Sequence, residues 1–337
     1  MEMERVPAAG YRIEGLPVAG IKREFSADNL KVPFKLWKSL RMAGGIIKEF
    51  RPDIVVGVGG YASAPLLWMA SRRGIPYIIQ EQNSYAGLTN KILGRKARLI
   101  CVAYEGMERF FKKERLLLTG NPVREGIRKA DEEMRREGAL KFGVAPENKT
   151  NLVIGGSLGS GTLNRCVMKW IEGTLSSDIT LLWQTGKYYH KEIEEFNRKN
   201  RRAFVKCFEF IKEMDLAYAT ANVVISRAGA GTISELSIAG KATIFVPSPN
   251  VAEDHQRHNA MSLVMKEAAL MINDEDAIHK LMEEAIRLVN NKSEISRLES
   301  NISKLAIKDS ARIISGEIIR LSGYGTIDQK GSLTDGD

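Results

Sequence analysis

Cysteine and histidine are scarce in this chain, with three and four of them among 337 residues. The cysteines, Cys101, Cys166 and Cys207, lie far apart and lack the spacing of a metal site. We interpret them as small buried hydrophobic residues of a protein in a reducing compartment. The histidines form no recognisable metal cluster either, so neither residue type predicts a metal centre.

Long apolar runs are missing as well. No run approaches the roughly 20 apolar residues of a membrane-spanning helix, and we expect no signal peptide. The apolar and charged fractions, 44% and 27%, are typical of a soluble globular protein, and the length suffices for two domains. The net charge of +9 favours an anionic partner without distinguishing a nucleotide from a nucleic acid or a lipid surface.

Two common nucleotide-binding motifs are absent. The loop at residues 154–160, IGGSLGS, directly follows an apolar run and has the composition of a phosphate site. No Gly-Lys-Ser/Thr follows it, so it is not the lysine-bearing P-loop. It also lacks the spacing of the dinucleotide fingerprint, which argues against a hydride-transfer enzyme.

A second glycine-rich turn lies in residues 222–247, NVVISRAGAGTISELSIAGKATIFVP. The pattern predicts a strand, a tight loop, a helix and another strand. Gly229 and Gly231 carry no Cβ, so a ligand can approach the backbone closely. Thr232 opens the helix, whose free N–H groups favour a phosphate, and Glu235 suits a ribose diol. An ordinary strand–helix turn is the alternative, but two such turns in one half argue for a diphosphate-bearing ligand.

Apolar, β-branched runs separated by helical spacers predict two doubly wound, Rossmann-like α/β domains. The predicted strands are residues 54–58, 77–80, 98–103, 115–118, 151–154, 180–183, 203–208, 223–225, 242–246 and 268–272. We take the polar segment at 141–150 as the linker, which places one domain at 1–145 and the other at 146–308. We expect a helix at 309–322 to pack back on the first domain and 323–337 to form a flexible tail.

Polar residues cluster after two predicted strands. Residues 81–90, EQNSYAGLTN, occupy a position that lines the ligand crevice in open parallel sheets, and their amides and hydroxyls suit a sugar. Ordinary turn chemistry is the alternative. Residues 254–260, DHQRHNA, open a later helix. There Gln256 and Asn259 suit hydroxyl groups, and His255 suits a donor or a phosphate unless it is simply solvated.

Residues 21–50 combine seven basic residues with aromatic and aliphatic ones. A basic helix of this kind can lie in the headgroup region of an anionic membrane. The alternative is a surface helix whose apolar stripe packs on its own sheet. The candidate membrane contacts are Lys31, Phe34, Lys35, Trp37, Lys38 and Arg41.

Six motifs together resemble one family, the bacterial UDP-N-acetylglucosamine:undecaprenyl-pyrophosphoryl-muramoylpentapeptide transferases of peptidoglycan synthesis (the MurG family). They are VGGYASAP at 58–65, EQNSYAGLTN at 81–90, GNPVR at 120–124, GGSLGS at 155–160, SRAGAGTISE at 226–235 and DHQRHNA at 254–260. The motifs occur in order and span most of the chain, which makes the resemblance far more specific than one glycine loop.

The resemblance implies the GT-B architecture of two Rossmann-like domains. It implies inverting transfer of N-acetylglucosamine from UDP-N-acetylglucosamine to lipid I, giving lipid II, with no obligatory cofactor. It also implies a peripheral protein at the cytoplasmic face of the bacterial plasma membrane, with the anionic membrane surface as a partner and no nucleic acid. A GT-B transferase with another acceptor, or a non-catalytic nucleotide-sugar-binding protein, is the alternative.

The same resemblance implies roles for individual residues. Asn83 would contact the transferred sugar, Gln256 would read its hydroxyls, and Arg124 and Ile211 would hold the uracil. Ser157 would bind the diphosphate. Phosphate and ribose would be bound by Ala230, Gly231, Thr232, Ile233, Ser234 and Glu235, with Glu235 on the ribose hydroxyls.

One motif of the family has no counterpart. The family starts with a strand ending in GGTGGH, whose histidine is the usual candidate for the general base, and this sequence contains no such stretch. We therefore expect the N-terminal domain to lack its first strand, that loop and the following helix. None of the four histidines matches the missing position, so we assign no catalytic base.

Overall fold

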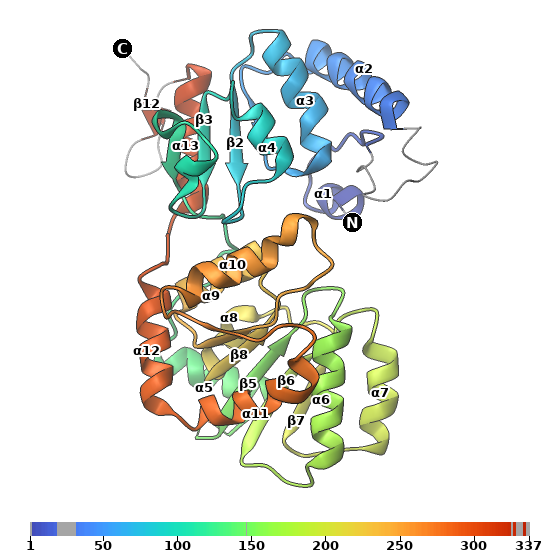
Figure 1. Cartoon of the computed structure of the whole chain (residues 1–337), viewed down its shortest axis with the longest axis vertical. Helices are drawn as coiled ribbons and strands as arrows, with labels where there is room; N and C mark the ends of the chain where they lie inside the picture. Colours follow the sequence, from blue (N-terminus) through green and yellow to red (C-terminus); the bar gives the residue numbers. More distant parts are fainter. Residues whose placement is uncertain (1, 19–31, 146, 325, 328–332, 335–337) are drawn as a thin grey trace. The chain divides into compact units, whose positions relative to one another are not determined.

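The computed structural model describes residues 2–18, 32–145, 147–324, 326–327 and 333–334 (Figure 1). The chain divides into two compact units. The first comprises Met1–Gln82, Ala86–Thr119 and Arg312–Asp337, and the second comprises Asn83–Tyr85 and Gly120–Ala311. Each unit is built on a parallel sheet with its own apolar core, as the alternating sequence pattern predicts.

The sheet of the first unit has the strand order β1-β2-β3-β4, and every neighbouring pair is parallel. Its strands are rich in Val, Ile and Leu, which suit strands buried on both faces. They are β1 (Val55–Gly57), β2 (Tyr77–Glu81), β3 (Leu99–Val102) and β4 (Leu116–Leu118). The helical segments associated with this sheet are α1 (Glu2–Ala8), α2 (Val32–Phe50), α3 (Gly60–Arg72), α4 (Leu88–Leu93), η2 (Met107–Arg109), η3 (Lys113–Arg115) and α13 (Ser310–Ser322).

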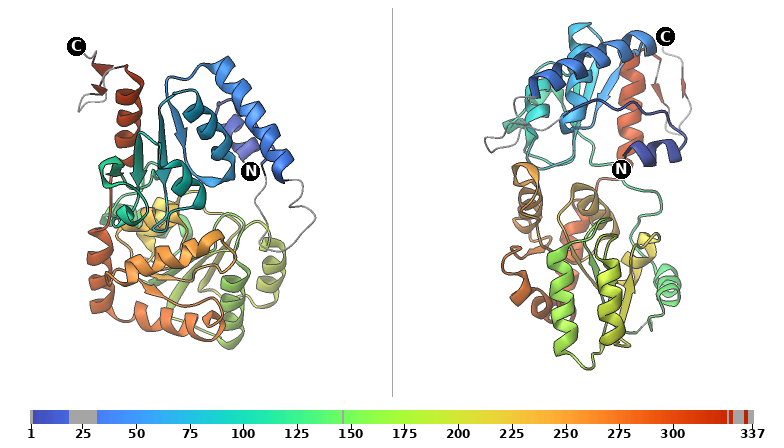
Figure 2. Two further views of the ribbon diagram at one scale, coloured as in Figure 1. Left: turned by 45° about the horizontal axis from the view of Figure 1, so that its top comes forward. Right: turned by 90° about the vertical axis from the view of Figure 1, so that its right-hand side faces the viewer.

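Alternate residues of the central strands face opposite sides of this sheet, and each side has its own helices (Figures 1 and 2). Ile79 packs in the cluster that includes Leu67 of α3. Ile78 and Cys101 pack with Ile314 of α13 instead. The last helix of the chain therefore completes the core of the first unit.

The sheet of the second unit has the order β10-β9-β8-β5-β6-β7, again with parallel neighbours. Its strands are β5 (Lys149–Ile154), β6 (Ile179–Gln184), β7 (Val205–Phe208), β8 (Val223–Ser226), β9 (Thr243–Phe245) and β10 (Leu270–Met271). The helical segments are α5 (Glu132–Phe142), α6 (Gly161–Gly173), α7 (His190–Lys199), α8 (Met214–Thr220), α9 (Ala230–Ala239), η4 (Ala252–Asp254), α10 (His255–Val264), α11 (Ala277–Val289) and α12 (Lys292–Ser303).

All ten strands expected from the sequence are present, with ends that differ by at most two residues. The predicted boundary at 145/146 differs from the observed division, because residues 120–145 belong to the second unit. Helix α5 packs closely on α8 there, since a Cβ on Gly138 would lie 2.6 Å from the carbonyl oxygen of Leu216. The segment expected to be a flexible tail contains β11 (Thr326–Ile327) paired antiparallel with β12 (Leu333–Thr334).

Candidate functional site

The two glycine-rich loops follow the carboxyl ends of two neighbouring strands in the second sheet. Strand β5 is central, and the chain continues from it to β6 and β7 on one side and to β8, β9 and β10 on the other. Ile154 pairs with Ser226, so the loops that follow β5 and β8 start side by side. Ligands of open parallel sheets bind at such a switch point. The loop with Ser157 and the loop leading to Glu235 are therefore placed as one shared ligand requires.

The loop after β5 packs tightly against the loop after β6 and the start of α6. Gly159 has a φ of 90°, and a Cβ there would overlap the carbonyl oxygen of Thr185. Only glycine fits both conditions. Ser160 ends the loop and caps α6, where its Oγ accepts a hydrogen bond from Leu163 N at 3.3 Å. Ser157 lies two residues before Gly159 and is partly exposed.

Helix α9 begins at the neighbouring loop without a side-chain cap. Its N-cap is Gly229, which has no side chain to accept a hydrogen bond, and the first turn carries no acidic residue. Exposed N–H groups and the helix dipole attract a phosphate at such an end. A Cβ on Gly231 would meet nothing within 4 Å, so the approach to this turn is open.

Glu235 lies one turn into α9 with both carboxylate oxygens engaged. The Nε of Arg124 donates to Oε1 at 2.7 Å, and the hydroxyl of Tyr218 donates to Oε2 at 2.9 Å. Asn121 reaches the same turn, because its Nδ2 donates to Ser234 Oγ at 3.1 Å. Asn121 and Arg124 therefore contact α9 at the residues to which the resemblance assigns ribose and uracil binding.

Arg227 ties together the loops around the switch point. Its Nε donates to Ser160 Oγ at 3.0 Å, and its Nη1 donates to Val246 O at 2.9 Å. The same Nη1 forms an ion pair with Asp274 at 2.5 Å. Asp274 Oδ2 in turn accepts a hydrogen bond from Thr162 of α6 at 3.0 Å. A single arginine therefore connects the segments that follow β5, β8, β9 and β10.

Ile211 is connected to the glycine-rich loop through one side chain. The Oε1 of Gln184 accepts a hydrogen bond from Ile211 N at 2.9 Å, and its Nε2 donates to Gly156 O at 3.2 Å. Ile211 is itself buried, with 2% of its surface exposed. The backbone of residue 211 is therefore held at the same edge of the sheet.

Gln256 and Asn83 are held by contacts at the start of α10. Gln256 Oε1 accepts a hydrogen bond from Ser248 N at 2.9 Å, which joins the start of α10 to the loop after β9. Asn259, one turn further along α10, donates through Nδ2 to Asn83 Oδ1 at 3.0 Å and accepts from Ser84 N at 2.9 Å. Asn259 Nδ2 also lies 3.4 Å from Ala228 O, in the loop that leads to α9.

Several residues that hold the site were missed from the sequence. Tyr218 and Asp274 lie outside every motif, and no local signal marks them. Gln184 had a weak signal, because it is a polar residue at the end of an apolar strand. Arg227 lies inside a quoted motif, and only the fold shows what it contacts.

Helix α2 of the first unit carries the candidate membrane contacts on its exposed face. Phe34 and Trp37 are 67% and 56% exposed, and Lys35, Lys38 and Arg41 are exposed beside them. The opposite face buries Ser39, Ala43, Gly44 and Ile47. Lys31 lies outside the described residues. One face of α2 therefore packs on the unit, as expected of a surface helix, while the other presents aromatic and basic side chains.

In the part of the chain that the structure describes, no helix combines the length and the apolar character that crossing a membrane requires. Among the same residues, no three His, Cys, Asp or Glu side chains form a group that could hold a metal ion.

Two parallel α/β units, the second with a glycine-rich turn and an acidic residue at its switch point, are the building blocks of the GT-B architecture. The glycosyltransferase family 28 N-terminal domain matches residues 1–102, and the glycosyltransferase family 28 C-terminal domain matches residues 150–315. The chain belongs to glycosyltransferase family 28.

Curated relatives and a solved structure agree with this assignment. Enzymes of Parabacteroides distasonis and Phocaeicola vulgatus, both named UDP-N-acetylglucosamine–N-acetylmuramyl-(pentapeptide) pyrophosphoryl-undecaprenol N-acetylglucosamine transferase, are each 51% identical. The alignments cover 95% and 96% of this chain and 87% and 86% of those proteins. The crystal structure of Acinetobacter baumannii MurG is 26% identical, with a TM-score of 0.71 over 94% of this chain and 86% of that chain.

Proposed function

We propose that the protein transfers N-acetylglucosamine from UDP-N-acetylglucosamine to undecaprenyl-pyrophosphoryl-MurNAc-pentapeptide (lipid I), giving lipid II for peptidoglycan. The observation that carries this proposal is the 51% identity, over 95% of the chain, to an enzyme named for that transfer. The bond between the sugar and the UDP diphosphate breaks, and the acceptor hydroxyl forms the new glycosidic bond with inversion. We assign no residue to the removal of the acceptor proton.

The donor site proposed here lies at the switch point of the second sheet. Glu235 would accept hydrogen bonds from the ribose hydroxyls, and Arg124 and Ile211 would hold the uracil. Ser157 and the first turn of α9, from Ala230 to Ser234, would bind the diphosphate. Asn83 and Gln256 would contact the sugar. The contacts of Arg124 with Glu235, and of Gln184 with both Ile211 and Gly156, support a single continuous nucleotide site.

The departing diphosphate needs stabilisation as the sugar is transferred. The uncapped start of α9 and the glycine loop after β5 offer backbone N–H groups in fixed positions. Preorganised donors of this kind stabilise developing charge without reorganising during the reaction. We therefore propose that these amides take the place of an obligatory metal ion.

We further propose that α2 contacts the anionic cytoplasmic face of the membrane, where the lipid acceptor is located. Phe34 and Trp37 are stacked with ring centroids 6.1 Å apart, and the guanidinium of Arg41 lies 5.8 Å from the centre of the Trp37 ring. Aromatic side chains among Lys35, Lys38 and Arg41 suit an anionic headgroup region. The protein would then be peripheral rather than spanning.

The reaction is tested by incubating the full chain with UDP-N-acetylglucosamine and lipid I and measuring lipid II by chromatography. We expect lipid II to form only when both substrates are present, and other UDP-sugars to be poor donors. Lipid II formation without dependence on UDP-N-acetylglucosamine would contradict the donor assignment. Saturable UDP binding without turnover would favour a non-catalytic nucleotide-sugar-binding protein.

The nucleotide site is tested separately by calorimetry with UDP. We expect Glu235→Ala to weaken UDP binding by roughly tenfold or more, because the ribose hydroxyls lose a charged acceptor. Glu195→Ala, at an exposed residue of α7, is the matched control and should bind UDP like the wild type. Unchanged affinity of Glu235→Ala would reject the ribose assignment.

A further inference from the structure

Tyr218 and Glu235 form a buried donor–acceptor pair. The Tyr218 side chain comes from α8, the short helix that connects β7 to β8, and only 2% of Tyr218 is exposed. Its hydroxyl lies 2.9 Å from Glu235 Oε2. Helix α8 packs against α9, so the contact joins two neighbouring helices of the second unit. No motif in the sequence includes Tyr218.

The phenol is held in its donating form. Burial raises the pKa of Tyr218 well above its usual value, and the negative charge of Glu235 acts in the same direction. The hydroxyl therefore keeps its proton throughout the physiological pH range and donates a hydrogen bond to the carboxylate. A hydrogen bond to a charged acceptor is stronger than a neutral one, and low exposure strengthens it further.

Arg124 binds the other oxygen of the same carboxylate. Its Nε lies 2.7 Å from Glu235 Oε1, and the Glu235 side chain is 10% exposed compared with 49% for Arg124. The carboxylate is thus fixed at both oxygens, by a buried neutral donor on one and a half-exposed cation on the other. An ionised carboxylate has about four lone-pair positions, so acceptor capacity remains for two further hydroxyl groups.

We propose that Tyr218 is a positioning residue that orients Glu235 toward the two ribose hydroxyls and so makes the site select ribonucleotides over deoxyribonucleotides. This inference rests on the proposed function, in which Glu235 binds the ribose. Without the Tyr218 hydroxyl, the carboxylate could rotate about its last side-chain bond, and the oxygen that loses its donor would have to find another partner. The carboxylate would then no longer be oriented toward the ribose hydroxyls before the nucleotide binds.

The test compares UDP with 2′-deoxy-UDP and 3′-deoxy-UDP by calorimetry on the full chain. We expect Tyr218→Phe to weaken UDP binding by about tenfold and to weaken binding of the deoxy analogues less. The ratio of the affinity for UDP to that for each analogue should therefore fall. Glu235→Ala should also weaken UDP binding. In the double variant, Tyr218→Phe should add no further loss, because its effect passes through the carboxylate.

Tyr104→Phe is the matched control, since the Tyr104 hydroxyl is buried in the first unit and has no hydrogen-bond partner among the described atoms. It should leave all three affinities unchanged. Circular dichroism melts identify a temperature at which every variant is folded. An equal loss for UDP and both analogues, or a loss from Tyr218→Phe that persists in the Glu235→Ala background, would overturn the positioning role. Wild-type UDP affinity in Glu235→Ala would instead reject the ribose assignment of the proposed function.

Discussion

Lys241 is a buried lysine two residues before β9, and only 8% of the residue is exposed. Its Nζ donates to Ala221 O at 2.9 Å. Burial lowers the pKa of Lys241 to about 8; nearby Glu299 opposes this shift, and Arg135 and Lys129 add to it. In the unfolded chain the same group titrates near 10.5. Between these two values the unfolded state binds more protons, so stability rises with pH across that window.

Replacing this lysine should remove that dependence. We expect Lys241→Met to flatten the rise in the free energy of unfolding between pH 8 and pH 10.5, a rise on the order of 1–3 kcal/mol in the wild type. Urea unfolding at several pH values measures it. Lys169→Met, at an exposed position of α6, is the control and should keep the wild-type profile. A Lys241→Met profile as steep as that of the control would contradict the prediction.

The residues of the candidate site were predictable to different extents. Ser157 and Glu235 could be expected near one edge, because both follow strands that a parallel sheet aligns. The contacts of Tyr218 and Asp274 could not, because they depend on how α8 packs on α9 and where β10 ends. Strand periodicity predicts which face a residue takes, but side-chain partners from distant segments follow only from packing.

At the scale of one element, helix stability and phosphate binding favour different residues at position 231 of α9. This residue has an ordinary helical φ and open space around its missing Cβ. Alanine there should stabilise the helix by about 0.5–1 kcal/mol. If the diphosphate approaches the first turn closely, the added methyl group should also weaken UDP binding.

We therefore expect Gly231→Ala to raise the melting temperature of the free protein and to lower its affinity for UDP. Thermal unfolding and calorimetry on the same sample measure the two effects. Gly173→Ala, at the end of α6, likewise has open space and is the control for added helix propensity without any effect on UDP. Equal UDP affinity in both variants would indicate that no phosphate contacts the turn.

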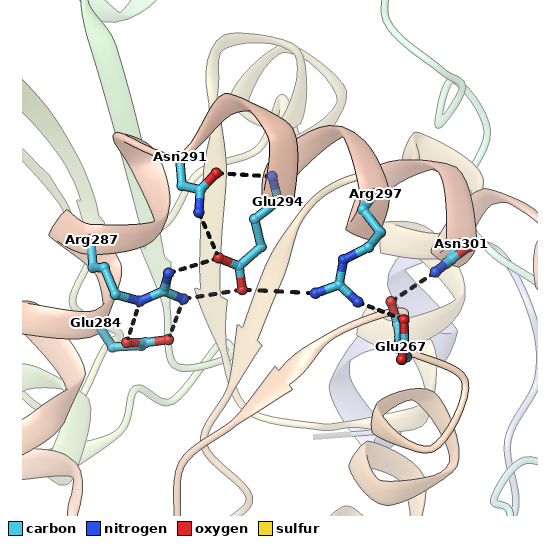
Figure 3. Close-up of polar contacts among 7 residues, drawn as sticks. All are labelled: Glu267, Glu284, Arg287, Asn291, Glu294, Arg297 and Asn301. Atoms are coloured by element: carbon cyan, nitrogen blue, oxygen red, sulfur yellow. Dashed lines mark hydrogen bonds and ion pairs between the residues drawn. The ribbon is translucent and has the colours of Figure 1, made fainter.

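Helices α11 and α12 are joined by a chain of polar contacts that also reaches the turn before β10 (Figure 3). Arg287 is central, donating to Glu284 at 2.7 Å and to Glu294 at 2.7 Å. Arg297 continues the chain to Glu267 at 2.6 Å. The hydrogen bond from Arg287 lowers the pKa of Glu294, so the stabilisation from Glu294 is complete above the usual glutamate pKa and is lost as the pH falls through the lower folded value.

Arg287→Met should lower the free energy of unfolding at pH 7 by about 1 kcal/mol or less, because Arg287 is half-exposed and solvent screens its ion pairs. The difference from the wild type should shrink as the pH falls below about 4.5, the usual glutamate pKa, and disappear once the pH is below the lower pKa of Glu294 in the folded protein. Thermal melts from pH 7 to pH 3 measure it. Arg198→Met, at an exposed arginine without an ion pair among the described residues, is the control. A loss that stays constant down to pH 3 would exclude the titration of Glu294 as its cause.

At the scale of the whole molecule, the sequence predicted two parallel α/β domains but placed their boundary differently. The polar composition of residues 141–150 is typical of a linker, yet α5 before it packs on α8 of the second unit. Composition indicates where a segment meets solvent, and it does not indicate which core the preceding helix joins. The C-terminal helix is the opposite case, because the expectation that it packs back on the first domain is confirmed by the contact of Ile314 with Ile78 and Cys101.

Because α13 completes the first core, a cavity there should affect the first unit alone. Ile314 is 7% exposed and packs with Ile78 and Cys101. Ile314→Ala should destabilise that unit by about 2–4 kcal/mol, whereas Ile302→Ala, at a fully buried residue of α12, should destabilise the second unit. UDP at about 100 times its dissociation constant should stabilise only the unit that binds it, by about 2.7 kcal/mol.

Calorimetric scans with and without UDP distinguish the two effects. One transition should have a midpoint temperature that UDP raises. Ile302→Ala should lower that midpoint, whereas Ile314→Ala should leave it unchanged. Ile314→Ala should instead lower the midpoint of the transition that UDP does not affect. Equal shifts of the UDP-sensitive transition in both variants would mean that the two cores unfold as one cooperative system. In that case the covering of Ile78 and Cys101 by α13 would stabilise the nucleotide site as well, because any loss in the first core would be shared by the second.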